Sequence, residues 1–127
     1  DGILNSLLLM EAMAYREKTL GEMIQEIREK IGPHYYRRKD LTLGNSKPGQ
    51  IKKIKKSLIS ELAEGNDCRI EELDGLKMIY NPSRWLLLRA SGTEPVIRIY
   101  AEAESKELVH KMIKEAEEIV IAQADNE

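Results

Sequence analysis

Apolar residues recur at helical spacing in several stretches of the chain, and the first of these lies close to the N-terminus. Residues 3–17 carry large apolar side chains on nearly every side of a helical wheel except that of Asn5, Ser6 and Glu11. A helix of this kind requires burial all round, and a short chain offers it little cover. We therefore expect residues 3–17 to lack their natural partner and to expose apolar surface that can pair with a second copy.

Two further helices have recognisable boundaries. Thr19 and Glu22 have the spacing of a capping box, which predicts that a helix begins there. Gly32-Pro33 predicts its end. A third helix is predicted to begin at Lys47-Pro48-Gly49 and to end at Gly65, with its apolar residues on one side.

Alternating apolar and polar residues predict strands in the second half of the chain, and a helix capped by Ser105 follows them. The short connections between consecutive strands favour antiparallel pairing. Two amphipathic helices against such a sheet make a two-layer domain. The sequence thus predicts an α+β fold, in which N-terminal helices precede a four-stranded antiparallel sheet with two helices on one face. The extended segments are residues 34–43, 68–72, 75–81, 84–90 and 96–103.

Composition and charge exclude several classes of function. The 127 residues are enough for one modest domain, and a net charge of −2 argues against a nucleic-acid partner. No apolar run is long enough to cross a membrane. Cys68 is the sole cysteine, so it cannot form an internal disulfide, and with two histidines it makes no zinc site. We expect a cytoplasmic protein without a signal peptide, and a start at Asp1 indicates a piece of a longer chain.

One polar segment between two apolar strands, residues 89–98, carries the candidate chemistry. Arg89 offers a planar fork of donors that suits a phosphate, and Ser91 and Thr93 add hydroxyl groups. Gly92 lets the backbone approach an anion and can adopt a positive φ, so that its N–H can bind an anion. Glu94 cannot bind phosphate, but it can hold an arginine in place. The alternative is that Ser-Gly-Thr forms only a polar hairpin turn.

Other polar residues are better explained by structure than by chemistry. Five lysines, at positions 47, 52, 53, 55 and 56, are expected to line the solvated face of a helix. His34 and His110 have no nucleophile nearby in the sequence, so we expect both at the surface. Cys68 is expected to be a half-buried apolar residue rather than a reactive thiolate.

The segment Arg89-Ala90-Ser91-Gly92-Thr93-Glu94-Pro95-Val96-Ile97-Arg98-Ile99-Tyr100 resembles the C-terminal phosphate-binding loop of the α-D-phosphohexomutases. This family includes phosphoglucomutase, phosphomannomutase and phosphoglucosamine mutase. Asp74-Gly75-Leu76-Lys77 and Trp85-Leu86-Leu87-Leu88-Arg89 are similar to the strands that lead into that loop. The opening residues 1–14 are similar to the helix that closes the family's third domain. The resemblance covers almost the whole chain.

The resemblance implies an isomerase with four domains, in which a phosphoserine of the first domain transfers its phosphoryl group to a hexose 1- or 6-phosphate. It also implies a Mg²⁺ ion bound by the second domain and a third domain that reads the sugar. The fourth domain, with a fold like that of the TATA-box-binding protein, grips the phosphate that is not transferred. This chain contains none of the serine, metal or sugar loops of the other domains.

The resemblance therefore assigns residues 1–17 to the preceding domain, 18–33 to a connecting helix and 34–127 to the C-terminal phosphate-binding domain. It carries over phosphate binding to Arg89, Ser91, Gly92 and Thr93, with Arg98 in support. No catalytic or metal-binding residue is carried over, so the chain alone is expected to be inactive. Its expected partners are the phosphosugar and the remaining domains. The alternative is a stand-alone interaction module whose loop is only a turn.

Overall fold

The structure, a computed structural model, describes residues 1–42, 48–63 and 67–125, and the chain divides into two compact units, Asp1–Pro33 and His34–Glu127. The first unit contains the helices α1 (Gly2–Arg16) and α2 (Leu20–Ile31). The second contains five strands, two helices and a π-helical turn: β1 (Tyr35–Thr42), α3 (Pro48–Leu58), the π-helical turn Ile59–Ala63, β2 (Arg69–Glu71), β3 (Leu76–Asn81), β4 (Arg84–Ala90), β5 (Val96–Ala103) and α4 (Lys106–Asp125). Lys47 and Gly65, at the predicted helix boundaries, lie outside the described residues.

Helix α1 has no buried residue, although its sequence is rich in large apolar side chains. Among them, Leu9 is 39% exposed and Ile3 is 77% exposed. The Asp1 carboxylate caps the helix by accepting hydrogen bonds from the N–H groups of Ile3 and Leu4. The exposed apolar surface is what the sequence predicts. Self-association through it, and the assignment of residues 1–17 to a preceding domain, stay predictions.

Helix α2 begins with the predicted capping box. The Thr19 hydroxyl accepts from the Glu22 N–H at 3.3 Å, and the Glu22 carboxylate accepts from the Thr19 N–H at 2.8 Å. The Glu22 carboxylate also accepts from the Thr19 hydroxyl at 2.7 Å, and this bond and the one from the Thr19 N–H favour the ionised carboxylate and lower the pKa of Glu22. The helix ends at Gly32, whose φ of 87° is disfavoured for residues with a side chain.

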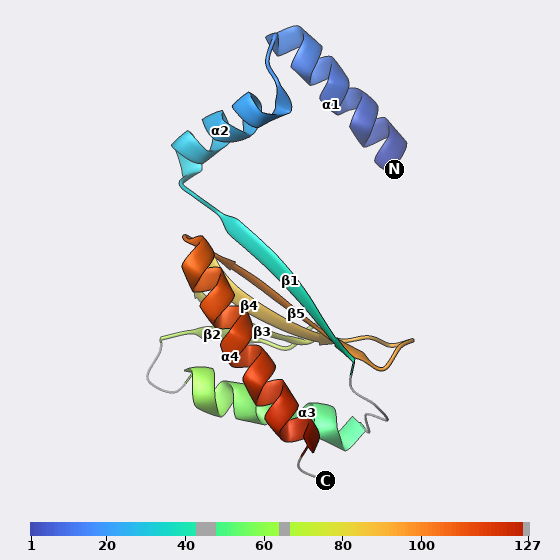
Figure 1. The fold of residues 1–127 in the computed structure, drawn as a ribbon, viewed down its shortest axis with the longest axis vertical. Helices are drawn as coiled ribbons and strands as arrows, with labels where there is room; N and C mark the ends of the chain where they lie inside the picture. The colour runs from blue at the N-terminus through green and yellow to red at the C-terminus, as the bar shows by residue number, and fades with distance from the viewer. Residues whose placement is uncertain (43–47, 64–66, 126–127) are drawn as a thin grey trace. The chain divides into compact units, whose positions relative to one another are not determined.

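The five strands form one antiparallel sheet in the order β1-β5-β4-β3-β2. The α+β class is confirmed, and the sheet has one strand more than the four predicted. All five strands nevertheless lie within the predicted extended segments, and the shortest, β2, has three residues at the edge of the sheet. Figure 1 shows α3 and α4 lying across the same face of this sheet. Among the described residues of the second unit, no helix lies on the opposite face.

The core lies between the sheet and these two helices. Buried and half-buried residues alternate strictly along β5, so that every second side chain points toward the helices. Burial of these side chains away from water is the main stabilising contribution to the second unit. Of the residues whose burial the structure describes, sixteen apolar ones are buried: Ile54, Leu58, Leu76, Met78, Leu86, Leu88, Ile97, Ile99, Ala101, Ala103, Val109, Met112, Ile113, Ala116, Ile119 and Val120.

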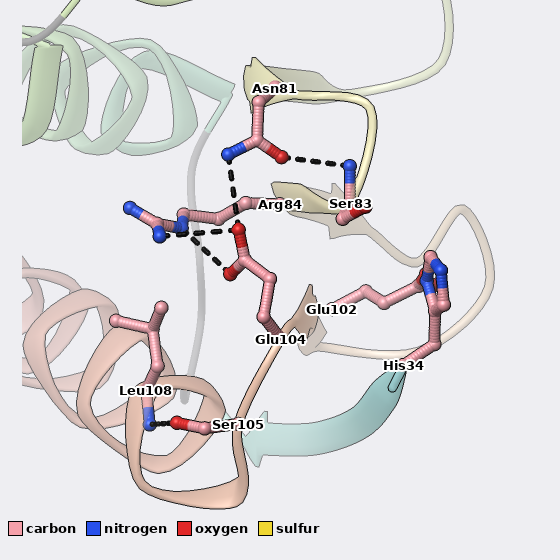
Figure 2. Close-up of polar contacts among 8 residues, drawn as sticks. All are labelled: His34, Asn81, Ser83, Arg84, Glu102, Glu104, Ser105 and Leu108. Carbon is pink, nitrogen blue, oxygen red and sulfur yellow. Dashed lines mark hydrogen bonds and ion pairs between the residues drawn. The ribbon is translucent and has the colours of Figure 1, made fainter. Parts of the chain in front are cut away.

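Polar contacts fasten the β3–β4 turn to the end of β5 (Figure 2). The Glu104 carboxylate accepts from Asn81 Nδ2 at 3.2 Å and from the Arg84 guanidinium at 3.1 and 3.3 Å. The Glu104 backbone N–H and the Arg84 guanidinium hold the pKa of that carboxyl below its ordinary value. The next residue, Ser105, accepts from the Leu108 N–H at 3.1 Å and caps α4 as predicted. The candidate loop, which joins β4 to β5, lies at the other end of these two strands.

Tyr80, half-buried on β3, provides a test of the packing against the π-helical turn. Its hydroxyl donates to the Leu62 carbonyl oxygen at 3.4 Å, and burial raises the pKa of Tyr80 to about 12. Because the folded state favours the neutral phenol, this stabilisation is complete below pH 10 and is lost as the pH rises from 10 to 12. We expect an ultraviolet titration to show one tyrosine that ionises near pH 12, and Tyr80→Phe to remove it. Titration of all tyrosines near pH 10 would contradict the packing.

Candidate functional site

Arg89 and Arg98 lie side by side on the face of the sheet that α3 and α4 do not cover. The register pairs Arg89 of β4 directly with Arg98 of β5, and it pairs Arg98 in turn with Asp40 of β1. Their neighbours Leu88 and Ile97 point the other way, into the core. Like charges directly opposite one another in a sheet repel, so this position requires negative charge nearby.

Three carboxylates supply negative charge to the two arginines. Arg89 Nη2 lies 3.1 Å from Asp74 Oδ2, and Arg98 Nη2 lies 3.1 Å from Glu94 Oε2. Arg98 Nε also lies 3.8 Å from Asp40 Oδ2. Glu94 thus contacts Arg98, which is the role expected for a carboxylate that holds an arginine. The sequence analysis did not identify Asp40 or Asp74 as part of the site.

Asp40 is itself fixed by a second arginine of the same strand. Arg38 donates from Nε and Nη2 to the two carboxylate oxygens of Asp40, at 2.6 and 2.5 Å. These bonds, together with the charges of Arg38 and Arg98, hold the pKa of Asp40 below its ordinary value. Asp40 therefore remains a full negative charge beside Arg98 at neutral pH.

One donor of this cluster has no acceptor. Arg98 Nε is buried and makes no hydrogen bond to any of the residues that the structure describes. A buried cationic N–H without an acceptor costs free energy, and such atoms are rare in folded proteins. An additional oxygen in this position would therefore be stabilising.

The loop between β4 and β5 is organised by Ser91, and Figure 1 shows it extending beyond the ends of the two strands. The Ser91 N–H donates to the Val96 carbonyl oxygen at 2.9 Å. Its hydroxyl oxygen accepts from the N–H groups of Thr93 and Glu94, at 3.4 and 3.3 Å. A hydroxyl that accepts two hydrogen bonds can still donate one. The loop is thus a closed polar turn whose exposed side chains include Thr93.

Gly92 does not have the backbone conformation that the sequence led us to expect. Among the described glycines, positive φ occurs at Gly32 and Gly75 and not at Gly92. A Cβ atom built on Gly92 meets nothing within 4 Å, whereas one on Gly75 would lie 2.3 Å from the Leu88 carbonyl oxygen. The position near the site at which only glycine fits without strain is therefore Gly75, which comes directly after Asp74. The role of the Gly92 N–H in phosphate binding stays a prediction.

Lys55 also differs from its expected role on a solvated helix face. Lys52, Lys53 and Lys56 are exposed as predicted, and Lys47 lies outside the described residues. Lys55 is half-buried instead, and its Nζ donates to the Gly75 carbonyl oxygen at 3.1 Å. It therefore attaches α3 to the turn that carries Asp74.

A hollow of about 200 Å³ beside the loop lies toward the helices rather than toward the arginines. Its lining includes Ile51 of α3 together with Ser91 and Pro95 of the loop. Neither Arg89 nor Arg98 contributes to it. An anion that contacts the arginines would bind on the open face of the sheet and not in this hollow.

The residues set aside in the sequence form no second site among the described residues. His34 Nδ1 lies 2.6 Å from Glu102 Oε1 (Figure 2), and His110 Nδ1 lies 2.6 Å from Arg37 Nη1. Burial, and then Asp67, raise the pKa of the half-buried Cys68 thiol, so it has no thiolate character at neutral pH. In the described ranges, no three histidine, cysteine or acidic side chains gather where they could hold a metal ion. No helix within those ranges is long and apolar enough to span a bilayer.

Comparison with known proteins supports the resemblance noted in the sequence. The family model described as "Phosphoglucomutase/phosphomannomutase, C-terminal domain" matches residues 36–119. A phosphoglucomutase/phosphomannomutase of Thermococcus kodakarensis is 35% identical over 114 residues, which are 90% of this chain and 23% of that protein. A phosphoglucosamine mutase of Methanococcus maripaludis is 32% identical over 115 residues, which are 90% of this chain and 24% of that protein.

A solved structure extends the similarity to the fold. It is the crystal structure of a phosphoglucomutase/phosphomannomutase family protein from Burkholderia thailandensis, which superposes with a TM-score of 0.51 at 20% identity. The match covers 80% of this chain and 20% of that protein. The chain spans about a quarter of the length of the curated relatives that it matches. It belongs to the phosphoglucomutase/phosphomannomutase family, and residues 36–119 form the family's C-terminal domain.

Proposed function

We propose that this domain binds the phosphate group of a hexose phosphate on the loop between β4 and β5. In this proposal Arg89 provides a bidentate contact, Ser91 and Thr93 donate from their hydroxyl groups, and the Gly92 N–H completes the cradle. Arg98 supports the dianion from the neighbouring strand. The bound phosphate is the one that stays on the sugar while the other is transferred. The domain then contributes orientation and electrostatic complementarity to an intramolecular phosphoryl transfer.

The observation that carries this proposal is the direct pairing of Arg89 with Arg98 beside a Ser-Gly-Thr turn. Two guanidinium groups on adjacent strands repel each other, and a dianion between them removes that repulsion. Within the part of the chain that the structure describes, Arg98 Nε also has no hydrogen-bond acceptor, so protein groups do not saturate this guanidinium. A turn that served only to join two strands would require neither arginine.

The phosphoryl transfer itself is assigned to the other domains of the parent mutase. Mg²⁺ would supply a Lewis acid there, but the described residues of this chain offer no cluster of ligands for it. The proposed function therefore includes no step that requires a metal ion bound to the described residues of this chain. We expect the isolated chain to give no turnover in a coupled mutase assay, and measurable turnover would contradict its being an incomplete enzyme.

Titration of the ¹⁵N-labelled chain with glucose 6-phosphate tests the binding proposal. We expect weak, saturable binding, with the chemical-shift changes clustered at residues 89–98. Titration with glucose at the same concentration is the control and should leave these signals unchanged. Shifts spread over the lysines of α3, or no saturation, would contradict the proposal and favour a stand-alone interaction module whose loop is only a turn.

A further inference from the structure

A row of four charged side chains crosses the open face of the sheet next to the loop. It begins at Asp40 on β1, passes through Arg98 and Arg89, and ends at Asp74 in the turn before β3. The two cations are thus flanked on both outer sides by carboxylates. Glu94, the third acidic residue, belongs to the loop itself.

The backbone around Asp74 is built so that its carboxylate reaches Arg89. Gly75 has a φ of 117°, and the Leu88 carbonyl oxygen occupies the place where a Cβ would lie. The turn can therefore press against β4 one residue before Arg89. Lys55 of α3 holds the same turn through the Gly75 carbonyl oxygen at 3.1 Å. Two independent contacts, one from β4 and one from α3, place Asp74 beside Arg89.

On the other side of the Arg89–Arg98 pair, Asp40 is also held in place by contacts with neighbouring side chains. Both of its oxygens accept from the Arg38 guanidinium, whose carbon also lies 5.7 Å from the centre of the Tyr100 ring. Strand pairing places Asp40 directly opposite Arg98. The carboxylate is thereby fixed 3.8 Å from the Nε atom that has no acceptor among the described residues.

The geometry points to Asp40 and Asp74 as positioning residues of the phosphate site. Asp40 holds Arg98 and Asp74 holds Arg89, each from the outer side of the arginine pair. Both guanidinium groups are thereby oriented for one dianion before it binds. This inference rests on the proposed function. Neither residue touches the phosphate. Because Asp74 is largely exposed and Arg89 is about half exposed, their ion pair contributes little to folding stability, and its main effect is to restrict the guanidinium.

For the Asp→Asn substitutions, the inference predicts a change in phosphate affinity opposite in sign to the change expected from net charge alone. Asp74→Asn removes a negative charge near an anion site, which by long-range electrostatics alone would strengthen phosphate binding. Loss of positioning instead weakens it, by about threefold, the range expected from one exposed ion pair. Asp40→Asn should act likewise, and the two factors should multiply because the residues contact different arginines.

The experiment is a titration of the full 127-residue chain with inorganic phosphate, in the wild type and in Asp74→Asn, Asp40→Asn and Asp74→Glu. Glu118→Gln is the matched control, because it removes a carboxylate from an exposed ion pair with Lys114 on α4 and changes the net charge equally. We expect weaker binding in both Asn variants, unchanged or tighter binding in the control, and recovery in Asp74→Glu. The side-chain Nε–H signals of Arg89 and Arg98 in the phosphate-free chain should shift in the matching Asn variant, while the unfolding temperature stays constant.

The outcomes separate the two proposals. If phosphate shifts no signal at residues 89–98 of the wild type, the proposed function fails and this inference falls with it. If the wild type binds there and the Asn variants bind as tightly as the Glu118→Gln control, the proposed function stands and the positioning role is overturned.

Discussion

Replacement of Arg89 by alanine is expected to weaken phosphate binding at least about tenfold, the largest effect on affinity that we expect from a single substitution. Arg89 provides the planar fork beside the loop, and charge-assisted hydrogen bonds of this kind each contribute about 1.5–3 kcal/mol. The folded state should be nearly unaffected, because the side chain is about half exposed and its ion pair with Asp74 is at the surface. Calorimetric titration with glucose 6-phosphate and thermal unfolding measure the two quantities.

Arg69→Ala is the matched control for this prediction. Arg69 lies on β2, is paired with Glu71 at 2.8 Å, and its removal changes the net charge of the chain by the same amount. It should reduce phosphate affinity only slightly, through the long-range field. Equal losses in the two variants would mean that phosphate senses only net charge. Undiminished binding in Arg89→Ala would favour the interaction module in which the loop is only a turn.

Alanine at position 75 is expected to have the largest effect on stability, a loss of about 2–4 kcal/mol in the free energy of unfolding. The φ of 117° is strained for any residue with a side chain, and the new methyl group would lie 2.3 Å from the Leu88 carbonyl oxygen. Because this neighbour is backbone in the middle of a paired strand, the turn must move away from β4. Urea denaturation of both chains measures the loss.

Gly92→Ala is the control, since a methyl group there meets nothing within 4 Å and its φ lies outside the left-handed region. Its free energy of unfolding should remain within about 1 kcal/mol of the wild type. A second consequence separates strain from a general loss of structure: Gly75→Ala should shift the side-chain signal of Arg89, because Asp74 moves with the turn. Equal stability of the two alanine variants would contradict the close approach of this turn to β4.

The helices and strands of both units could be predicted because their determinants are local. The capping residues Thr19 and Ser105 act on N–H groups three residues away, and the alternation along β5 depends only on which side of the strand a residue lies. Each of the five strands falls within a predicted extended segment, even β2, whose three residues are all exposed, although the predicted total was four.

The candidate site was predictable in part for the same reason. Residues 89–98 are continuous in the chain, so their guanidinium, hydroxyl and glycine groups could be recognised together. Glu94 and Arg98 are four residues apart around a single turn, and their ion pair follows from that proximity. The positive φ considered for Gly92 is found instead at Gly75, where the close approach of the backbone depends on a strand that lies elsewhere in the sequence.

By itself the sequence determined the order of elements, the inward face of each strand, the helix caps and the position of the candidate loop between β4 and β5. Only the tertiary structure decided that Arg89 meets Arg98, that Asp40 and Asp74 flank them, and that Lys55 fastens the turn at Gly75. The physical reason is that side-chain periodicity and capping act over a few residues. Strand register and the packing of a turn against a distant strand arise only when the whole core is buried at once.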